Sequence, residues 1–244
     1  MIIHKLILQH LAHRDDAGFY LLQALDAIRW MENQGVRITT STRALDLGCG
    51  HGILGGELLK RGCQVTFADE ADFLLPQIPK NLFRRINVDL EDLLSLGAFD
   101  LVICSNVYEH LARPEQFIAS LGKLLSPGGW FYLSWTNWLS PWGGHEFSPF
   151  HYLGATRGHR VFDRLTRRRR LHTPFVNLFP TYIGRTLERL RRQPDLQVLK
   201  VAPRYYPELS WLTRIPVVRE FAIWNCAVLL AKRSPASVGP SRLR

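Results

Sequence analysis

The stretch from residue 44 to 52, ALDLGCGHG, constrains the fold of this chain more than any other part of it. Its apolar first half is typical of a buried strand, glycine then recurs at 48, 50 and 52, and residues 53–61 have helical character. Glycine allows a sharp turn and a close approach of a ligand, while free amides at a helix N-terminus point at that ligand. The stretch therefore predicts a nucleotide-binding corner.

Asp46 helps to choose the ligand of this corner. Gly50, Gly52 and Gly55 also satisfy the GxGxxG pattern of dinucleotide-binding proteins, so the glycines alone do not choose. A carboxylate before the turn would repel a pyrophosphate, whereas it would hold an ammonium group. S-adenosylmethionine (SAM) has an amino-acid tail and a sulfonium in place of phosphates, so Asp46 favours SAM. A nicotinamide-dependent oxidoreductase is the alternative from a different class.

The composition is ordinary for a globular protein. Of 244 residues, 46% are hydrophobic and 21% are charged, and the chain is long enough to bury a full core. No apolar stretch approaches the roughly 20 residues that span a bilayer, and the N-terminal apolar run is too short for a signal peptide. The four cysteines are scattered and show no metal-like pairs, which predicts reduced thiols in a cytoplasmic protein.

Strands and helices alternate over the first 137 residues. This spacing predicts βαβ units in an α/β fold, a doubly wound and mostly parallel sheet with helices on both faces. From Asn137 the pattern breaks, and we expect a long insert. Helices are predicted at 15–33, 53–61, 114–125 and from 181, and strands at 44–47, 63–68, 84–88, 99–105, 130–136, 196–202 and 221–232.

Acidic residues follow the second and third predicted strands. Asp69 and Glu70 stand at about the distance past the glycine turn that is expected of a ribose-binding acid. One carboxylate can accept hydrogen bonds from both ribose hydroxyls, although an acid in this place could also be the N-cap of a helix. Asp89 and Leu90, after the third strand, are placed to meet an adenine edge.

Five stretches in the order and spacing of one family resemble the class I SAM-dependent methyltransferases, particularly the bacterial small-molecule branch with the ubiquinone-biosynthesis O-methyltransferases. They are ALDLGCGHG, TFADEA, NVDLEDL, FDLVICSNVYEHL and LLSPGGWFYLS, and they cover roughly residues 40–137. The resemblance implies a Rossmann-like methyltransferase sheet whose last strand is antiparallel and inserted beside its neighbour. The cofactor-binding residues that it implies are Asp46, Gly48, Cys49 and Gly50 for the methionine part, Asp69 and Glu70 for the ribose, Asp89 and Leu90 for adenine, and Ser105 and Asn106 under the transferred methyl group.

Histidines near the acceptor side are the candidate catalytic residues. Some relatives bind a divalent metal through Glu-x-x-Glu-His, but this chain has Asn106-x-x-Glu109-His110 and lacks one carboxylate, so we expect no metal there. His145, His151 and His110 are the candidates, because an imidazole near neutral pKa can act as a general base. Alternatively, these histidines only pack or hydrogen-bond within the structure, and Glu146 could orient His145 or His151.

The positive charge of the chain is concentrated in one segment. Residues 157–192 hold 11 arginines against two acids, which accounts for most of the net charge of +10. This segment can be a solvated face, a contact for anionic lipid or a phosphate-bearing acceptor, or a nucleic-acid footprint. Neither the Asp/Asn-Pro-Pro-aromatic motif nor the Pro-Cys pair of nucleic-acid methyltransferases is present, which disfavours the last interpretation.

Together these features predict one methyltransferase domain over residues 1–232, with N-terminal helices in 1–40, an acceptor-side basic insert at 138–195, and a disordered tail at 233–244. The expected activity is methyl transfer from SAM, most simply to oxygen on a small or lipid-linked anionic acceptor. The expected location is the cytoplasm, with peripheral contact at the inner membrane face through residues 157–192. The sequence is also compatible with an RNA methyltransferase that uses the arginine-rich insert, and with a non-catalytic membrane-surface protein.

Overall fold

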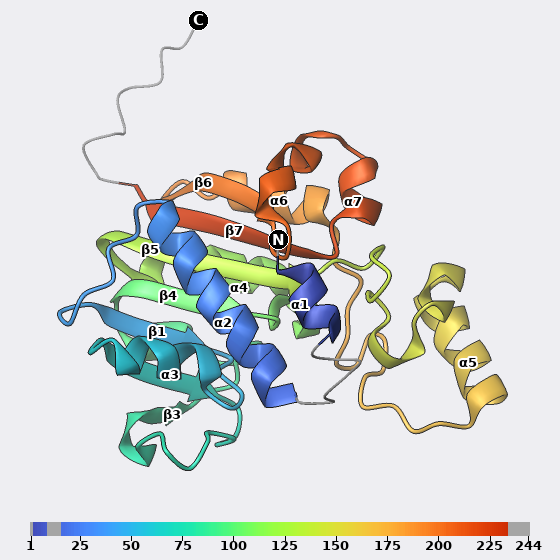
Figure 1. The fold of residues 1–244 in the computed structure, drawn as a ribbon, viewed down its shortest axis with the longest axis horizontal. Coiled ribbons are helices and arrows are strands. Elements are labelled where there is room, and N and C mark those ends of the chain that lie inside the picture. Colours follow the sequence, from blue (N-terminus) through green and yellow to red (C-terminus); the bar gives the residue numbers. More distant parts are fainter. Residues whose placement is uncertain (1, 9–15, 234–244) are drawn as a thin grey trace, which may run out of the picture.

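A sheet of seven strands runs through the described part of the chain, residues 2–8 and 16–233 of the computed structural model (Figure 1). Its order is β3-β2-β1-β4-β5-β7-β6. Neighbours from β3 to β5 are parallel, while β7 is antiparallel to both β5 and β6. The mostly parallel sheet and the inserted antiparallel last strand are therefore confirmed. The strands are β1 (Arg43–Leu47), β2 (Gln64–Asp69), β3 (Phe83–Arg85), β4 (Phe99–Ser105), β5 (Leu125–Thr136), β6 (Leu196–Pro203) and β7 (Asn225–Lys232).

Helices cover both faces of the sheet because its strands are apolar on both sides. Successive residues of a strand point to opposite faces, so Ala44 packs with Leu58 of α3 in one cluster. Leu45 packs with Phe117 of α4 and Leu187 of α6 in the other. The helices are α1 (Ile3–Leu8), α2 (Asp16–Asn33), α3 (Ile53–Lys60), α4 (Pro114–Ser120), α5 (Ala155–Thr166), α6 (Ile183–Arg191) and α7 (Val218–Ala222).

The strand order reverses between β1 and β4, which are direct neighbours in the sheet. In open α/β sheets, ligands bind in the crevice outside the carboxyl ends of the strands at such a switch point. Leu47, Asp69 and Ser105, the last residues of β1, β2 and β4, end at this edge. The fold therefore brings the predicted cofactor residues to one place.

Two strands are shorter than the predicted ones because their partners end. β7 begins at Asn225, which pairs with Thr136, the last residue of β5. Phe221, predicted to begin this strand, has no strand to pair with and lies in α7 instead. Similarly, Arg85 pairs with Asp69 at the end of β2, so β3 spans residues 83–85 rather than the predicted 84–88.

The insert after β5 has structure that the sequence did not predict. It contains α5 and carries a small core of its own, formed by Trp138, Phe147, Phe162 and Leu178. In Figure 1, α5 stands away from the sheet at the right of the view. The predicted disordered tail lies, from residue 234 onward, outside the described residues. Within the described ranges, no helix has the length and apolarity that crossing a membrane requires.

Candidate functional site

The glycine corner lies between the end of β1 and the start of α3. Gly48, Gly50 and Gly52 have φ of 69°, 50° and 71°, in the left-handed region that favours glycine. A Cβ on Gly48 would lie 2.3 Å from Cγ2 of Val107, whereas a Cβ on Gly50 would meet nothing within 4 Å. Gly48 thus lets the turn pack against the segment after β4, and Gly50 leaves the backbone open to a ligand. Cys49 between them is half-buried, and burial raises the pKa of its thiol.

Asp46 lies beneath this corner and is only 5% exposed. Its Oδ2 accepts a hydrogen bond of 2.8 Å from the amide of Gly55, and a side chain at position 55 would collide with this carboxylate. Burial raises the pKa of the Asp46 carboxyl to about 7, since desolvation disfavours its charged form. A ligand ammonium would favour the carboxylate, so the corner fits the amino-acid end of SAM better than a pyrophosphate.

Asp69 stands at the carboxyl end of β2, beside the glycine turn. Its Oδ2 accepts a hydrogen bond of 2.7 Å from the amide of Gly50, and its Oδ1 accepts one of 2.8 Å from the amide of Glu70. The Glu70 side chain itself is exposed. Each oxygen of Asp69 keeps a further lone pair, so the carboxylate is oriented by main-chain amides and can still accept hydroxyl hydrogen bonds.

Asp89, which follows β3, is hydrogen-bonded to the segment between β4 and α4. Its carboxylate accepts hydrogen bonds from the amides of Ala112 and Arg113, at 3.0 and 2.7 Å. The neighbouring Leu90 is 62% exposed. The adenine role of Asp89 and Leu90 stays a prediction, and the geometry shows in addition that Asp89 fixes the start of α4.

Ser105 and Asn106 follow β4 and are linked to a buried arginine that the sequence did not single out. Arg204 is 5% exposed, and its Nη1 donates to Oγ of Ser105 at 2.9 Å and to Oγ of Ser134 at 3.2 Å. Asn106 has a φ of 57°, and its Oδ1 accepts from Nδ2 of Asn225 at 2.8 Å. In the sequence, Arg204 is the single arginine of the PRYYP stretch, residues 203–207, which begins at the end of β6.

The guanidinium of Arg204 is incompletely satisfied. Its Nε is buried and has no hydrogen-bond partner among the described residues. Arg204 also forms no ion pair with a described residue, although its charge lowers the pKa of Asp26 against a larger increase from burial. A buried cation therefore lies next to the residues that are expected under the methyl group.

Two of the predicted catalytic histidines, His110 and His145, come together, with ring centroids 5.3 Å apart. His172, which the sequence did not single out, joins them at 5.1 Å from His110 and 4.6 Å from His145. Glu146 binds Nδ1 of His172 at 2.9 Å and not either of the histidines predicted for it. Burial lowers the pKa of His145 to about 4, so its imidazole is neutral at physiological pH.

His151 is placed elsewhere, inside the small core of the insert. It is 1% exposed, its Nε2 lies 2.9 Å from the carbonyl oxygen of Ser140, and its ring packs edge-on against Trp138. Burial also lowers its pKa. These contacts are those of a residue that holds the loop together, and the catalytic role of His151 stays a prediction.

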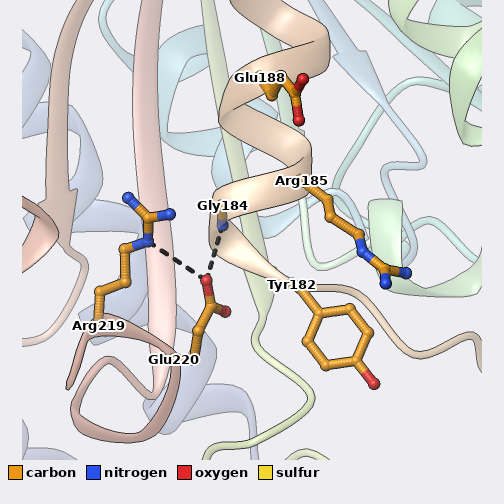
Figure 2. Close-up of a pocket in the computed structure, with 6 residues that line it drawn as sticks. All are labelled: Tyr182, Gly184, Arg185, Glu188, Arg219 and Glu220. Atoms are coloured by element: carbon orange, nitrogen blue, oxygen red, sulfur yellow. Dashed lines mark hydrogen bonds and ion pairs between the residues drawn. The ribbon is translucent and has the colours of Figure 1, made fainter. Parts of the chain in front are cut away.

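A surface pocket lies away from the glycine corner. Figure 2 shows this pocket between the N-terminus of α6 and α7, where Glu220 accepts hydrogen bonds from the amides of Ile183 and Gly184. Arg219 contacts the same carboxylate at 3.3 Å. Because the Glu220 carboxylate already caps the helix, we attribute this depression to helix packing and not to the chemistry of the switch point. Its lining is Tyr182, Gly184, Arg185, Glu188, Arg219 and Glu220.

Comparison with known proteins gives these observations a family context. A family model described as a methyltransferase domain matches residues 45–131. An uncharacterized methyltransferase of Mycolicibacterium gilvum is 39% identical over 137 residues, which cover 55% of this chain and 52% of that protein. Another, of Mycobacteroides abscessus, is 29% identical over 235 residues, or 88% of this chain and 87% of that protein. The chain thus matches about half the length of the first relative and most of the second.

A solved structure extends the similarity to the fold. The SAM-dependent methyltransferase of Mesorhizobium loti superimposes with a TM-score of 0.58 at 19% identity, covering 85% of this chain and 98% of that one. At this identity the similarity concerns the fold. It extends beyond the 45–131 segment, since 85% of this chain is covered.

Proposed function

We propose that this chain is a class I SAM-dependent methyltransferase and that it methylates oxygen on a small or lipid-linked anionic acceptor. The methyltransferase-domain model over residues 45–131 and the relatives described as methyltransferases support this proposal. When bound, SAM supplies a methyl group that is activated by a positively charged sulfur. Asp46 is the group that would hold its ammonium, and Asp69 is oriented to accept the ribose hydroxyls. The space beside the backbone of Gly50, where a Cβ would meet nothing within 4 Å, leaves room for the cofactor.

The observation that supports an anionic acceptor is the buried guanidinium of Arg204. It donates to Ser105, which is expected from the family resemblance to lie under the methyl group, and its Nε has no partner among the described residues. A guanidinium has donors only and cannot lose its charge, so a buried one stabilises an anion nearby. A carboxylate, phenolate or phosphate on the acceptor would supply that anion.

The chain's own residues must align the acceptor, exclude water and, for a hydroxyl, take up a proton. The acceptor oxygen forms the new bond to the methyl carbon while the carbon–sulfur bond breaks and its electron pair stays on sulfur. An acceptor that is already an oxyanion needs no base. For a neutral hydroxyl, His110, five residues beyond the end of β4, is the candidate proton acceptor, whereas the lowered pKa of His145, about 4, makes that imidazole a weak base.

A second part of the proposal concerns the basic lobe, residues 155–176. Its arginines 157, 160, 164 and 167–169 are exposed, and none forms an ion pair with a described residue. Large apolar side chains are exposed beside them, among them Leu165 at 67% and Leu171 at 82%. Phosphates of any kind attract arginine, but only a membrane also takes up apolar side chains. The lobe therefore favours an anionic membrane surface over nucleic acid.

The activity is tested with the purified chain and radiolabelled SAM. We expect methyl transfer to phenolic and carboxylate acceptors and none to their O-methylated counterparts. S-adenosylhomocysteine should bind in calorimetry, and Asp69→Ala should weaken that binding by about 1–3 kcal/mol, the range for a lost charged hydrogen bond. Tight NAD binding without S-adenosylhomocysteine binding would contradict the proposal.

Arg204→Met separates the acceptor from the cofactor. It removes the charge and the donors but keeps most of the apolar volume, so we expect a higher KM for an anionic acceptor at unchanged S-adenosylhomocysteine affinity. A neutral acceptor of similar shape is the matched control, because its KM should not respond. If both KM values change equally, Arg204 only supports the packing of the site.

A further inference from the structure

His110, His145 and His172 come from three separate segments and converge on one point. Each offers one ring nitrogen, and these three atoms all lie within 4.8 Å of one another. His110 ends the turn after β4, His145 begins the turn at 145–147, and His172 follows the basic arginine run. We propose that these three imidazoles bind a divalent transition metal of the zinc class.

The hydrogen bonds around two of the rings engage Nδ1 and leave Nε2 available to a metal. Nδ1 of His110 lies 2.7 Å from the carbonyl oxygen of Asn177. A carbonyl only accepts, so Nδ1 carries the hydrogen and the lone pair of His110 is on Nε2. Nδ1 of His172 lies 2.9 Å from the Glu146 carboxylate, which fixes the same tautomer. A histidine that donates to a carbonyl or carboxylate through its other nitrogen is the usual arrangement around bound metals.

The third ring lacks a partner. Nδ1 of His145 is buried and makes no hydrogen bond with a described residue. Oε2 of Glu109, a side chain that is 1% exposed, is likewise without a partner among the described residues, while its Oε1 accepts from the amide of Thr136. Buried polar atoms are normally satisfied, and a cation bound nearby would satisfy both of these. Two carboxylates, Glu109 and Glu146, would balance its double charge.

The ligand type determines the class of metal. Imidazole nitrogens suit zinc, copper, nickel and iron, whereas magnesium and calcium prefer oxygen ligands. Zinc–nitrogen bonds of about 2.0–2.1 Å place tetrahedral nitrogens about 3.3 Å apart. Nitrogens that lie within 4.8 Å of one another must therefore approach by at most about 1.5 Å. All three are on turns and loops, where such movement is available. Three protein ligands leave a fourth position for water or an acceptor oxygen.

This site differs from the one that the sequence excluded. The expectation of no metal considered Asn106, Glu109 and His110, where an oxygen-rich site lacks a carboxylate. The new site shares only His110 with that set and takes its other ligands from the insert. His110 is four residues from Asn106, so a metal here would border the acceptor side of the methyl group.

The test measures metal binding without cofactor or acceptor, so its outcome is independent of the proposed function. The full chain is purified without a polyhistidine tag, stripped with a chelator and titrated with Zn²⁺ against a chromophoric competitor. We expect one saturable equivalent per chain, and Co²⁺ should give the intense visible bands of four-coordinate geometry. Millimolar Mg²⁺ should not compete.

Variants assign the ligands. Glu146→Gln should weaken Zn²⁺ binding about 10–100-fold, the range for lost support of a ligand, and His110→Ala or His172→Ala should weaken it further. His159→Ala is the matched control, because His159 lies in the same lobe and its Nδ1 is already hydrogen-bonded to the carbonyl oxygen of Ala155. Unchanged S-adenosylhomocysteine affinity and circular dichroism show that each variant is folded. Absence of stoichiometric binding, or binding that survives the double variant of His110 and His172, would overturn the proposal.

Discussion

Between residues 44 and 106, the groups at the ligand edge are main-chain amides and carboxylates near the ends of strands. Between residues 138 and 182, they are side chains on loops and single helical turns. Asp69 is held by two main-chain amides, whereas His172 is held by one carboxylate, that of Glu146 in the single helical turn 145–147. The cofactor site is thus rigid because the sheet is rigid. The acceptor side depends on a few side-chain contacts, each of which a single substitution can change.

A second contrast separates two basic helices of similar composition. In α6, Arg189 pairs with Glu115, Arg192 just after the helix pairs with Glu188, and Arg185 lies over the ring of Tyr182. Inside α6, Leu187 is buried against the sheet. The arginines of α5 have no such partners among the described residues. Equal charge in the sequence therefore has two roles: α6 is a structural helix, and α5 presents a free positive surface.

The largest expected effect is on the rigid side, from Asp46→Asn. Asparagine keeps the shape and can still accept from Gly55, but it removes the charge that holds the ligand ammonium. We expect S-adenosylhomocysteine to bind more weakly by about 1.5–3 kcal/mol, the range for hydrogen bonds to charged groups. Calorimetry measures this change. An affinity that stays unchanged would mean that the methionine end is held by main-chain groups alone.

A smaller effect is expected at the basic lobe. Arg160→Gln with Arg164→Gln should weaken binding to phosphatidylglycerol vesicles by about 2 kcal/mol, because each arginine near an anionic surface contributes about 1 kcal/mol. Arg189→Gln with Arg192→Gln is the matched control in the other helix, and it should change vesicle binding much less. Sedimentation with anionic and neutral vesicles gives both values. The contrast between the helices is wrong if the two double variants bind vesicles equally, or if RNA competes for the basic lobe as effectively as vesicles do.

Sequence periodicity was sufficient for the sheet because parallel strands covered on both faces must be apolar along their whole length. It was insufficient where a strand ends by losing its partner, as β7 does at Asn225, since pairing is not a local property. It also missed α5, whose residues are mostly polar and pack only against the insert. At the site, acids spaced after strands were recognisable, whereas Arg204 and His172 reach it from distant segments, and nothing in their local sequence indicates that they do.

A pH dependence sharpens the description of the cofactor site. The Asp46 carboxyl has a pKa of about 7 in the free protein, and the ligand ammonium favours its ionised form. Only about one carboxyl in ten is ionised at pH 6, so S-adenosylhomocysteine affinity should rise about tenfold between pH 6 and 8. Calorimetry in buffers of different ionisation enthalpy should detect the released proton at pH 6.5.

The stability of the ligand-free protein should change in the opposite direction. A raised pKa means that the folded state holds a proton that the unfolded state has lost, so the contribution to the free energy of unfolding is complete below about pH 4, the ordinary value for Asp, and is lost as pH rises to about 7. Asp46→Asn should abolish both the pH dependence of S-adenosylhomocysteine affinity and that of the free energy of unfolding. Urea unfolding across this pH range measures the second. A wild-type slope that persists in this variant would assign the titration to another group.

The smallest effect tests whether α6 belongs to the scaffold. Glu220 accepts from the amides of Ile183 and Gly184, so it caps a helix from a distant part of the chain, as Figure 2 shows for Gly184. Glu220→Ala leaves these two amides unsatisfied and should lower the free energy of unfolding by about 1 kcal/mol, a typical value for a lost N-cap. Because α6 does not face the membrane in our proposal, vesicle binding should be unaffected. A loss of vesicle binding without a loss of stability would instead make the pocket at Glu220 part of the membrane contact and remove the distinction between the two basic helices.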